Sequence, residues 1–353
     1  MKRFLRRAAA LLLTFALFAF LAIFIWPEAK PVAYVADDAY RAQALAYPVP
    51  DLPADWTTRK VPMADGTKIH VGQSGNRETA KATLLFVPGY TSAIDFYGDQ
   101  YDMLTARGFH LVAMDLRGQG RSGRHRESHP QKMYVKDFSV YGDDIAQVID
   151  ALDLAGGKPL VLMGMSLGGA AVTRAAQDHD TGAEALLLLA PAYRPFTPPY
   201  DFEQGKRIVA LGRMLGKSER YLAGQTDWVP DGLDMTVPTD CGRYPPRLYT
   251  RDAMYMREPS LMVGGMTFSL LGEMLENGEI VTQPDRLAAM DMPVTIVLPE
   301  RDVIVDSTIA EAACNGMTDC KATEIPKSGH CLTLENDDVL NAMWDEAEGL
   351  LGR

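Results

Sequence analysis

Short apolar runs alternate with amphipathic segments along most of this 353-residue chain. The expected strands occupy residues 82–87, 110–115, 159–165, 184–190, 293–299 and 321–326. Segments with apolar residues at helical spacing lie between them, and residues 138–154 are the clearest example. A strand that is apolar throughout is buried on both faces, which is typical of a parallel sheet covered by helices on both sides. The sequence therefore predicts an α/β fold with a mostly parallel central sheet.

Other stretches do not follow this alternation. A hairpin is expected around Asp65-Gly66, before the first apolar run. Residues 27–55 are rich in Pro, Ala and Asp and are interpreted as a linker. Residues 193–288 are too long for a loop between two strands, and we interpret them as an inserted helical cap. The expected organisation is a core in two parts, residues 56–192 and 289–353, interrupted by this cap.

The first 26 residues differ from the rest of the chain. Residues 8–26 form an uncharged run of 19 residues, and four basic residues precede it, Lys2, Arg3, Arg6 and Arg7. At about 1.5 Å per residue, a helix of this length spans the hydrocarbon core of a bilayer. We expect residues 1–26 to be an uncleaved signal anchor, a transmembrane helix that leaves the rest of the chain on the exported side. The alternative is a cleaved signal peptide, which would release the body.

The acidic balance of the chain restricts its partners. The formal net charge is −11, and without the four basic residues of the anchor the body has 31 basic and 46 acidic residues, a charge of −15. Such a surface repels nucleic-acid phosphates and anionic lipid headgroups. We therefore expect no nucleic-acid partner, and we expect membrane contact to depend on the N-terminal helix.

A pentapeptide of the form G-x-S-x-G lies between an expected strand and an expected helix. It is Gly164-Met165-Ser166-Leu167-Gly168, and this strand–turn–helix context is the one that a nucleophile elbow requires. The alternative is an ordinary glycine-rich turn. The context favours Ser166 as a catalytic nucleophile, which needs a base to remove its proton.

The expected base is His330, which follows the last expected strand. Asp302 lies just after the strand at 293–299 and is the expected partner of that histidine, with Glu300 and Asp306 as rival acids. The order Ser, Asp, His is the order found in α/β-hydrolases. In a parallel sheet all three residues would lie at the carboxyl ends of strands, where sites form.

The negative oxygen that forms on nucleophilic attack needs backbone N–H donors. We expect one donor to be the amide of Leu167, directly after the nucleophile, and the other to be the amide of Tyr90, in the loop after the strand at 82–87.

A glycine-rich segment, residues 118–123, matches a dinucleotide-binding pattern but is followed by a polar loop that ends at Pro130. A dinucleotide site needs a helix at that point, so we expect no cofactor. His125 and His129 in that loop lack clear partners, and we expect no metal site.

Four cysteines in an exported body permit disulfides. Cys314 and Cys320 are separated by five intervening residues between an expected helix and an expected strand, so we expect them to pair. Cys241 lies in the cap and Cys331 adjoins His330, and the sequence leaves open whether these two pair.

Taken together, these motifs resemble α/β-hydrolases of the monoacylglycerol lipase and bacterial lysophospholipase type. The resemblance covers about residues 57–350. Its marks are MDLRGQGRSGR (114–124), KMYVKDF (132–138), GMSLGG (164–169), EPSLMVGGMTFSLL (258–271) and PERDVIVD (299–306). The resemblance implies the roles assigned above to Ser166, Asp302, His330, Tyr90 and Leu167. The chain departs from the family pattern at Pro88, Tyr134 and Cys331.

The expected function is that of a membrane-anchored serine hydrolase acting on lysophospholipids or monoacylglycerols without a cofactor. A small-ester esterase or a peptidase on the same fold is the alternative within the enzymes. A catalytically inactive binding protein is the alternative outside them.

Overall fold

The computed structural model describes residues 35–230 and 234–351, together with positions 7, 11, 13, 14 and 17. The expected anchor at residues 1–26 therefore lies almost entirely outside the described residues. Within the described ranges, no helix combines the length and the apolar character that a membrane crossing requires.

The centre of the described structure is an eight-stranded sheet with the order β1-β2-β4-β3-β5-β6-β7-β8. The strands are β1 (Thr57–Pro62), β2 (Lys68–Ser74), β3 (Ala82–Val87), β4 (Phe109–Met114), β5 (Leu160–Met165), β6 (Ala185–Leu189), β7 (Val294–Pro299) and β8 (Cys320–Ile325). The pairs β1–β2 and β2–β4 are antiparallel, and the other five pairs are parallel. The prediction of an α/β fold with a mostly parallel sheet is confirmed.

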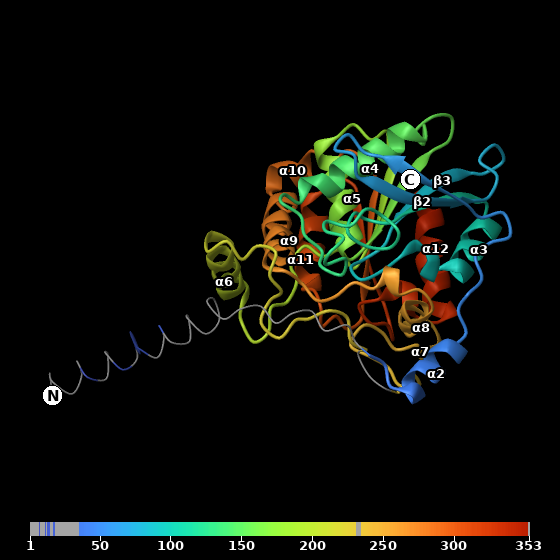
Figure 1. Cartoon of the computed structure of the whole chain (residues 1–353). Coiled ribbons are helices and arrows are strands. Elements are labelled where there is room, and N and C mark those ends of the chain that lie inside the picture. Colours follow the sequence, from blue (N-terminus) through green and yellow to red (C-terminus); the bar gives the residue numbers. More distant parts are fainter. Residues whose placement is uncertain are drawn as a thin grey trace.

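Helices cover both faces of the sheet (Figure 1). The helices α4 (Ser139–Ala151), α5 (Leu167–Asp178) and α11 (Ser307–Gly316) pack on one face. The helices α3 (Gly98–Ala106) and α12 (Asp337–Leu350) pack on the other face. Every residue of β3, β4, β5, β6 and β7 is buried, because the side chains of each strand point alternately into these two apolar layers.

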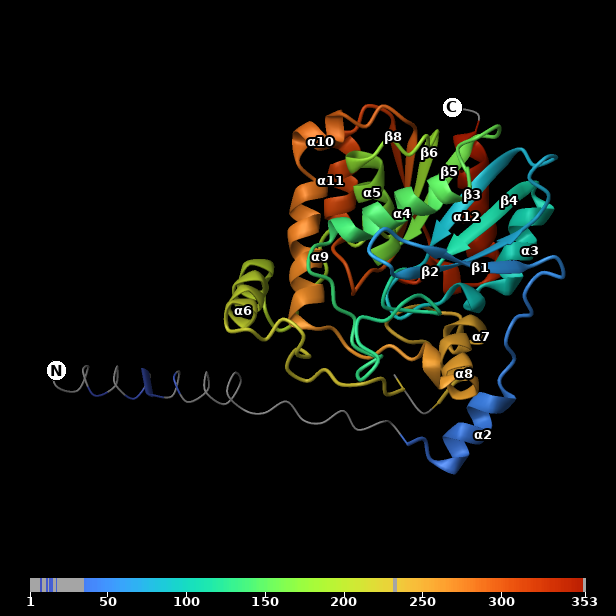
Figure 2. The same ribbon diagram turned by 45° about the horizontal axis from the view of Figure 1, so that its top comes forward.

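The segment between β6 and β7, called the cap excursion below, corresponds to the expected cap. It contains the helices α6 (Phe202–Met214), α7 (Pro245–Leu248), α8 (Thr250–Arg257), α9 (Phe268–Val281) and α10 (Pro284–Ala288). Figure 2 shows α7 and α8 below the sheet and α6 at the far side of α9. Buried residues of α9, among them Leu270 and Met274, belong to the same apolar layer as α4 and α5. The helix α9 of this segment is therefore part of the core.

The stretch interpreted as a linker contains the helix α2 (Asp38–Ala46). Asp37 caps its first turn by accepting a hydrogen bond from the amide of Tyr40 at 2.7 Å. Tyr40 is buried, and its hydroxyl donates to Asp252 of α8 at 2.9 Å. This segment therefore packs against the cap excursion.

The structure contains two disulfides. One joins Cys314 at the end of α11 to Cys320 at the start of β8. The other joins Cys241 in the cap excursion to Cys331, the residue after His330. The pairing that the sequence left open thus links the cap covalently to the loop that carries the expected base.

Candidate active site

Ser166 lies at the sharp turn between β5 and α5, with a φ of +52° and a ψ of −114°. A positive φ is unusual for a serine and marks a strained backbone. Gly164 and Gly168, two residues before and two residues after Ser166, leave no room for a side chain. A Cβ on Gly164 would lie 2.4 Å from the carbonyl oxygen of Gly168, and a Cβ on Gly168 would lie 2.1 Å from the carbonyl oxygen of Val87. The amide of Ser166 donates to the carbonyl of Leu189 at 2.9 Å, which fixes the turn against β6.

Of the three residues predicted to form a triad, His330 lies within hydrogen-bond distance of both Ser166 and Asp302. The Nε2 atom of His330 lies 2.8 Å from the Oγ of Ser166, and its Nδ1 atom lies 2.7 Å from Oδ2 of Asp302. The other carboxylate oxygen of Asp302 accepts from the amides of Ile304 and Val305, each at 2.8 Å. The loop after β7 thus holds Oδ1 of this carboxylate, and Oδ2 in turn orients the imidazole.

The two rival acids lie elsewhere. Glu300 is exposed and accepts a hydrogen bond from the amide of Lys327. Asp306 is the N-cap of α11 and accepts from the hydroxyl of Thr308 at 2.6 Å. The structure therefore brings only Asp302 of these three carboxylates to the ring of His330.

The loop after β3 approaches Ser166 closely. A Cβ on Gly89 would lie 3.3 Å from the Cβ of Ser166. The carbonyl of Gly89 accepts a hydrogen bond at 2.7 Å from the buried side-chain amide of Gln119. Because the C=O and N–H of a trans peptide point in opposite directions, this bond turns the N–H of Tyr90 away from Gln119. Leu167, the other expected donor, is the first residue of α5, where N–H groups have no partner within the helix.

Two tyrosines connect this loop to the cap excursion. The hydroxyl of Tyr90 donates to the carbonyl of Gly264 at 2.7 Å. The hydroxyl of Tyr255, on α8, donates to the carbonyl of Thr91 at 2.9 Å. Thr91 has a φ of +58°, so the loop is held in an unfavourable backbone conformation by contacts from the cap.

A buried carboxylate holds the next part of the loop. Asp115, directly after β4, accepts from the amide of Ile94 and from the amide of Arg121, each at 2.8 Å. Burial raises the pKa of Asp115 to about 7, although these two hydrogen bonds act in the opposite direction. The segment containing Gln119 and the loop containing Tyr90 are thus joined through two separate contacts.

Glu335 holds the loop that carries His330. Its Oε1 atom accepts from the amide of Gly329 at 2.7 Å and from the amide of Arg243 at 3.0 Å. The side chain is buried, and burial raises its pKa. Together with the disulfide between Cys241 and Cys331, this carboxylate binds the histidine loop to the cap excursion.

A cavity of about 760 Å³ opens at Ser166 and His330. Its walls come from the loop after β3, from the cap excursion and from the loop after β7. Among the described residues, no group of three or more His, Cys, Asp or Glu side chains is arranged to hold a metal ion. Ser166, His330 and Asp302 provide for attack by a serine hydroxyl, assisted by an imidazole and a carboxylate.

The fold and the hydrogen-bonded triad of Ser166, His330 and Asp302 define an α/β-hydrolase. The chain belongs to the Hydrolase_4 family, Serine aminopeptidase, S33, which matches residues 78–337. It is a carboxylic ester hydrolase of the lysophospholipase and monoacylglycerol lipase type, so the resemblance read from the sequence is confirmed.

Three similar proteins illustrate the relationship. The probable lysophospholipase L2 of Haemophilus influenzae is 26% identical over 250 residues, which cover 70% of this chain and 74% of that protein. A soluble variant of the monoglyceride lipase of Saccharomyces cerevisiae, solved with a substrate analog, superposes with a TM-score of 0.64 at 18% identity, covering 87% of this chain and 98% of that one. A membrane phospholipase A, a bacterial virulence factor, superposes with a TM-score of 0.53 at 17% identity and covers 99% of each chain.

Several residues of the site were not expected from the sequence. Gln119, Asp115 and Glu335 hold loops in place through contacts with distant parts of the chain. Gln119 and Asp115 lie in the segment MDLRGQGRSGR, which carried the resemblance without indicating a role for either residue. No motif in the sequence indicated a role for Glu335.

Proposed function

We propose that the protein hydrolyses carboxylic esters of single-chain acyl lipids, lysophospholipids or monoacylglycerols, through an acyl-enzyme on Ser166. The hydroxyl of Ser166 attacks the ester carbonyl while His330 takes its proton, and Asp302 stabilises the imidazolium. The tetrahedral intermediate carries a negative oxygen, which the amides of Tyr90 and Leu167 stabilise. His330 then protonates the leaving alcohol, and water hydrolyses the acyl-enzyme by the reverse sequence of proton transfers.

The observation that carries this proposal is the hydrogen-bonded triad of Ser166, His330 and Asp302, which opens to a cavity with an apolar wall. That wall includes Met266 and Met274 from the cap excursion and Ile304 from the loop after β7. Methionine side chains adapt to flexible apolar ligands, so the wall suits an acyl chain. The names of the lysophospholipase and monoglyceride lipase relatives support the same class of substrate.

We also propose that residues 1–26 anchor the enzyme in a membrane with the catalytic body on the exported side. The support is the uncharged run at residues 8–26 with basic residues before it. The membrane phospholipase A that aligns along 99% of this chain is consistent with this arrangement. Because the body has a charge of −15, its proximity to lipid would depend on the anchor.

The test is turnover of the full-length protein in detergent with esters of increasing acyl length, together with labelling by a fluorophosphonate. We expect preference for long acyl chains, and labelling that is lost in Ser166→Ala. Labelling that persists in Ser166→Ala would contradict the assignment of the nucleophile. A variant without residues 1–26, measured on micelles and on bilayer vesicles, tests the anchor: its loss of activity should be confined to vesicles.

A small-ester esterase or a peptidase is the alternative. The peptidase is included because the family description is Serine aminopeptidase. A preference for acetyl or butyryl esters over long-chain esters would support the first. Release of an amino acid from a peptide amide at a rate comparable to ester hydrolysis would support the second.

A further inference from the structure

The disulfide between Cys241 and Cys331 lies in the wall of the cavity at Ser166. Both cysteines line the cavity, and both are partly exposed. Cys241 ends a run of five consecutive cavity-lining residues, 237–241, and Cys331 directly follows the base, His330. The bond therefore joins one wall of the cavity to the loop that carries the base, across a sequence separation of 90.

The backbone is held on both sides of His330. Before it, the amide of Gly329 donates to Glu335 at 2.7 Å. After it, the amide of Cys331 donates to the carbonyl of Cys241 at 2.6 Å. The two chain segments are in direct contact here, since a Cβ on Gly329 would lie 2.9 Å from the carbonyl oxygen of Cys241. The position of the imidazole therefore depends on how firmly Cys241 is held.

The segment around Cys241 has little internal structure to hold it. Residues 234–244 form neither a helix nor a strand. The amide of Cys241 donates to the hydroxyl of Thr239 at 3.1 Å, a local contact that does not fix the segment relative to the histidine loop. The amide of Arg243 reaches that loop through Glu335 at 3.0 Å. The disulfide adds a covalent bond at the residue next to the base and is the strongest attachment between the two segments.

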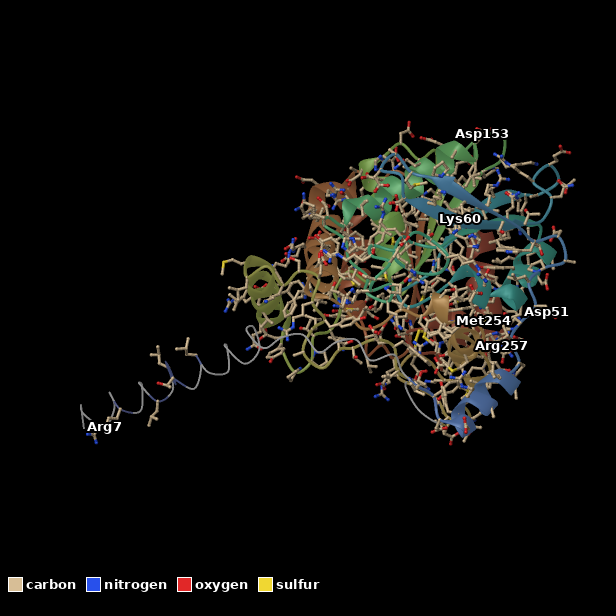
Figure 3. All side chains as sticks on the ribbon, in the orientation of Figure 1. Arg7, Asp51, Lys60, Asp153, Met254 and Arg257 are labelled. Atoms are coloured by element: carbon tan, nitrogen blue, oxygen red, sulfur yellow. A yellow bond between two sulfur atoms is a disulfide. The ribbon has the colours of Figure 1, made fainter. Side chains whose placement is uncertain are left out.

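The cap excursion is also attached to the body at places away from the histidine loop. Arg257, labelled on α8 in Figure 3, donates to the carbonyls of Leu45 and Tyr47. Arg247 donates to Asp99 at 2.7 Å. Loss of the disulfide is therefore expected to loosen the cavity wall and the histidine loop without detaching the excursion from the body.

The second disulfide of the chain differs in each of these respects. Cys314 and Cys320 have a sequence separation of only 6, and Cys314 is buried. They join the end of α11 to the start of β8, and neither lines the cavity. The site lies at the carboxyl ends of the strands, so the removal of this bond should leave the catalytic residues in place. The chain thus contains its own control for the effect of losing a disulfide.

We propose that the Cys241–Cys331 disulfide is a redox-sensitive positioning element: rapid hydrolysis requires it, and a dithiol that reaches it through the cavity lowers kcat reversibly. Thiols are kept reduced in the cytoplasm and are oxidised outside it, so such a bond restricts rapid hydrolysis to protein that has been exported. The inference rests on Ser166 and His330 as nucleophile and base and does not depend on the class of ester.

The chemistry is thiol–disulfide exchange. A thiolate of the dithiol attacks one sulfur of the Cys241–Cys331 bond, the S–S bond breaks, and a mixed disulfide forms. The second thiol of the reductant then displaces the protein sulfur and leaves as a cyclic disulfide. The protein gains two electrons and two protons and ends with two thiols, and a small disulfide such as oxidised glutathione reverses the reaction.

The experiment measures kcat and KM for p-nitrophenyl butyrate, and the rate of fluorophosphonate labelling, on the full-length protein in detergent before and after treatment with dithiothreitol. Reduction is expected to lower kcat by about tenfold or more, with a smaller change in KM, because a displaced imidazole takes the proton of Ser166 less well. Labelling should slow in parallel, and oxidised glutathione should restore both rates. Alkylation of the free thiols followed by mass spectrometry identifies the cysteines that were reduced, and circular dichroism reports on the fold.

The double substitution Cys241→Ala with Cys331→Ala removes the bond permanently, and Cys314→Ala with Cys320→Ala is the matched control. The first pair closes the longer loop, so its removal should lower the melting temperature more. Rates are therefore compared well below the melting temperatures of both variants. The first variant should have a low kcat that dithiothreitol does not change. The control should match the unmodified protein, both before and after reduction.

Several results would overturn the proposal. One is a full kcat in the variant without Cys241 and Cys331, or in protein whose two thiols have been alkylated at these positions. A raised KM with an unchanged kcat is another, since the bond would then shape only the cavity wall. A loss of kcat accompanied by loss of the circular dichroism signal would show that the bond maintains the fold instead of the position of His330. A loss in dithiothreitol that persists without Cys241 and Cys331 would place the effect elsewhere.

Failure of the proposed function would be a different result. Oxidised protein that cleaves p-nitrophenyl butyrate but neither a lysophospholipid nor a monoacylglycerol would contradict the proposed substrate class. The redox dependence of kcat and of fluorophosphonate labelling would still be measurable on the same protein.

Discussion

The side-chain amide of Gln119 donates a hydrogen bond to the carbonyl of Gly89 at 2.7 Å, and Gly89 lies in the loop that approaches Ser166. The bond fixes one peptide plane, and the N–H on the other side of that plane belongs to Tyr90. Gln119 is therefore a positioning residue: it does not touch the reacting atoms but sets the direction of the Tyr90 N–H, the proposed oxyanion donor.

Replacing Gln119 with leucine is expected to lower kcat by about 10- to 100-fold, less than the roughly 10²- to 10³-fold seen when an oxyanion donor is removed outright, with little change in KM. The reason is that the peptide can rotate once the carbonyl of Gly89 loses its partner. Steady-state kinetics on a long-chain ester provide the measurement. Gln119→His retains an N–H donor and should recover part of kcat. A Leu variant with normal kcat would show that the loop is held by its other contacts alone.

Asp302→Asn is expected to reduce kcat by about 10⁴-fold, since the amide NH₂ would face the wrong tautomer of His330. The fold should survive, because the asparagine oxygen can still accept from Ile304 and Val305. Initial rates and circular dichroism of the same preparation check both statements. Asp306→Asn is the control, since Asn is also a good N-cap and α11 should be unaffected.

The sheet could be predicted from the sequence because its central strands are buried on both faces and are therefore apolar throughout. The placement of Ser166 could be predicted because strand, turn and helix are local. The helix α2 was missed because its stability depends on Tyr40, whose hydroxyl reaches Asp252 across 212 residues. The bond between Gln119 and Gly89 and the disulfide between Cys241 and Cys331 were missed or left open because they also join residues far apart in the sequence. The two cysteines have a sequence separation of 90. No local periodicity encodes such contacts.

Glu335 gives a prediction about the histidine loop. In Glu335→Ala the amides of Gly329 and Arg243 lose their acceptor, so His330 should be less well oriented and kcat should fall by about tenfold or more. Glu335→Gln keeps an oxygen at the same place and should retain most of the activity. The comparison of kcat between the two variants is the measurement. Equal losses in both would mean that the charge of Glu335, and not its position as an acceptor, matters.

Asp115 gives a prediction about pH. Burial raises its pKa from an ordinary value of 3.8 to about 7, so the folded protein retains a proton that the unfolded chain has released between these two values. The unfolded state then binds fewer protons, and the free energy of unfolding falls as the pH rises from about 4 to about 7. Above pH 7 both states are ionised, and this contribution no longer changes.

The variant Asp115→Asn lacks this titration, although it loses one acceptor for the amides of Ile94 and Arg121 at every pH. The stability advantage of the unmodified protein over Asp115→Asn should therefore shrink by about 2–3 kcal/mol between pH 5 and pH 7.5, and stay constant above that. Urea denaturation of the full-length protein in detergent, followed by tryptophan fluorescence at several pH values, measures this difference. Asp150→Asn, which removes an exposed carboxylate, is the control. A difference that stays the same across the whole range would show that Asp115 is already ionised at pH 5 in the folded protein.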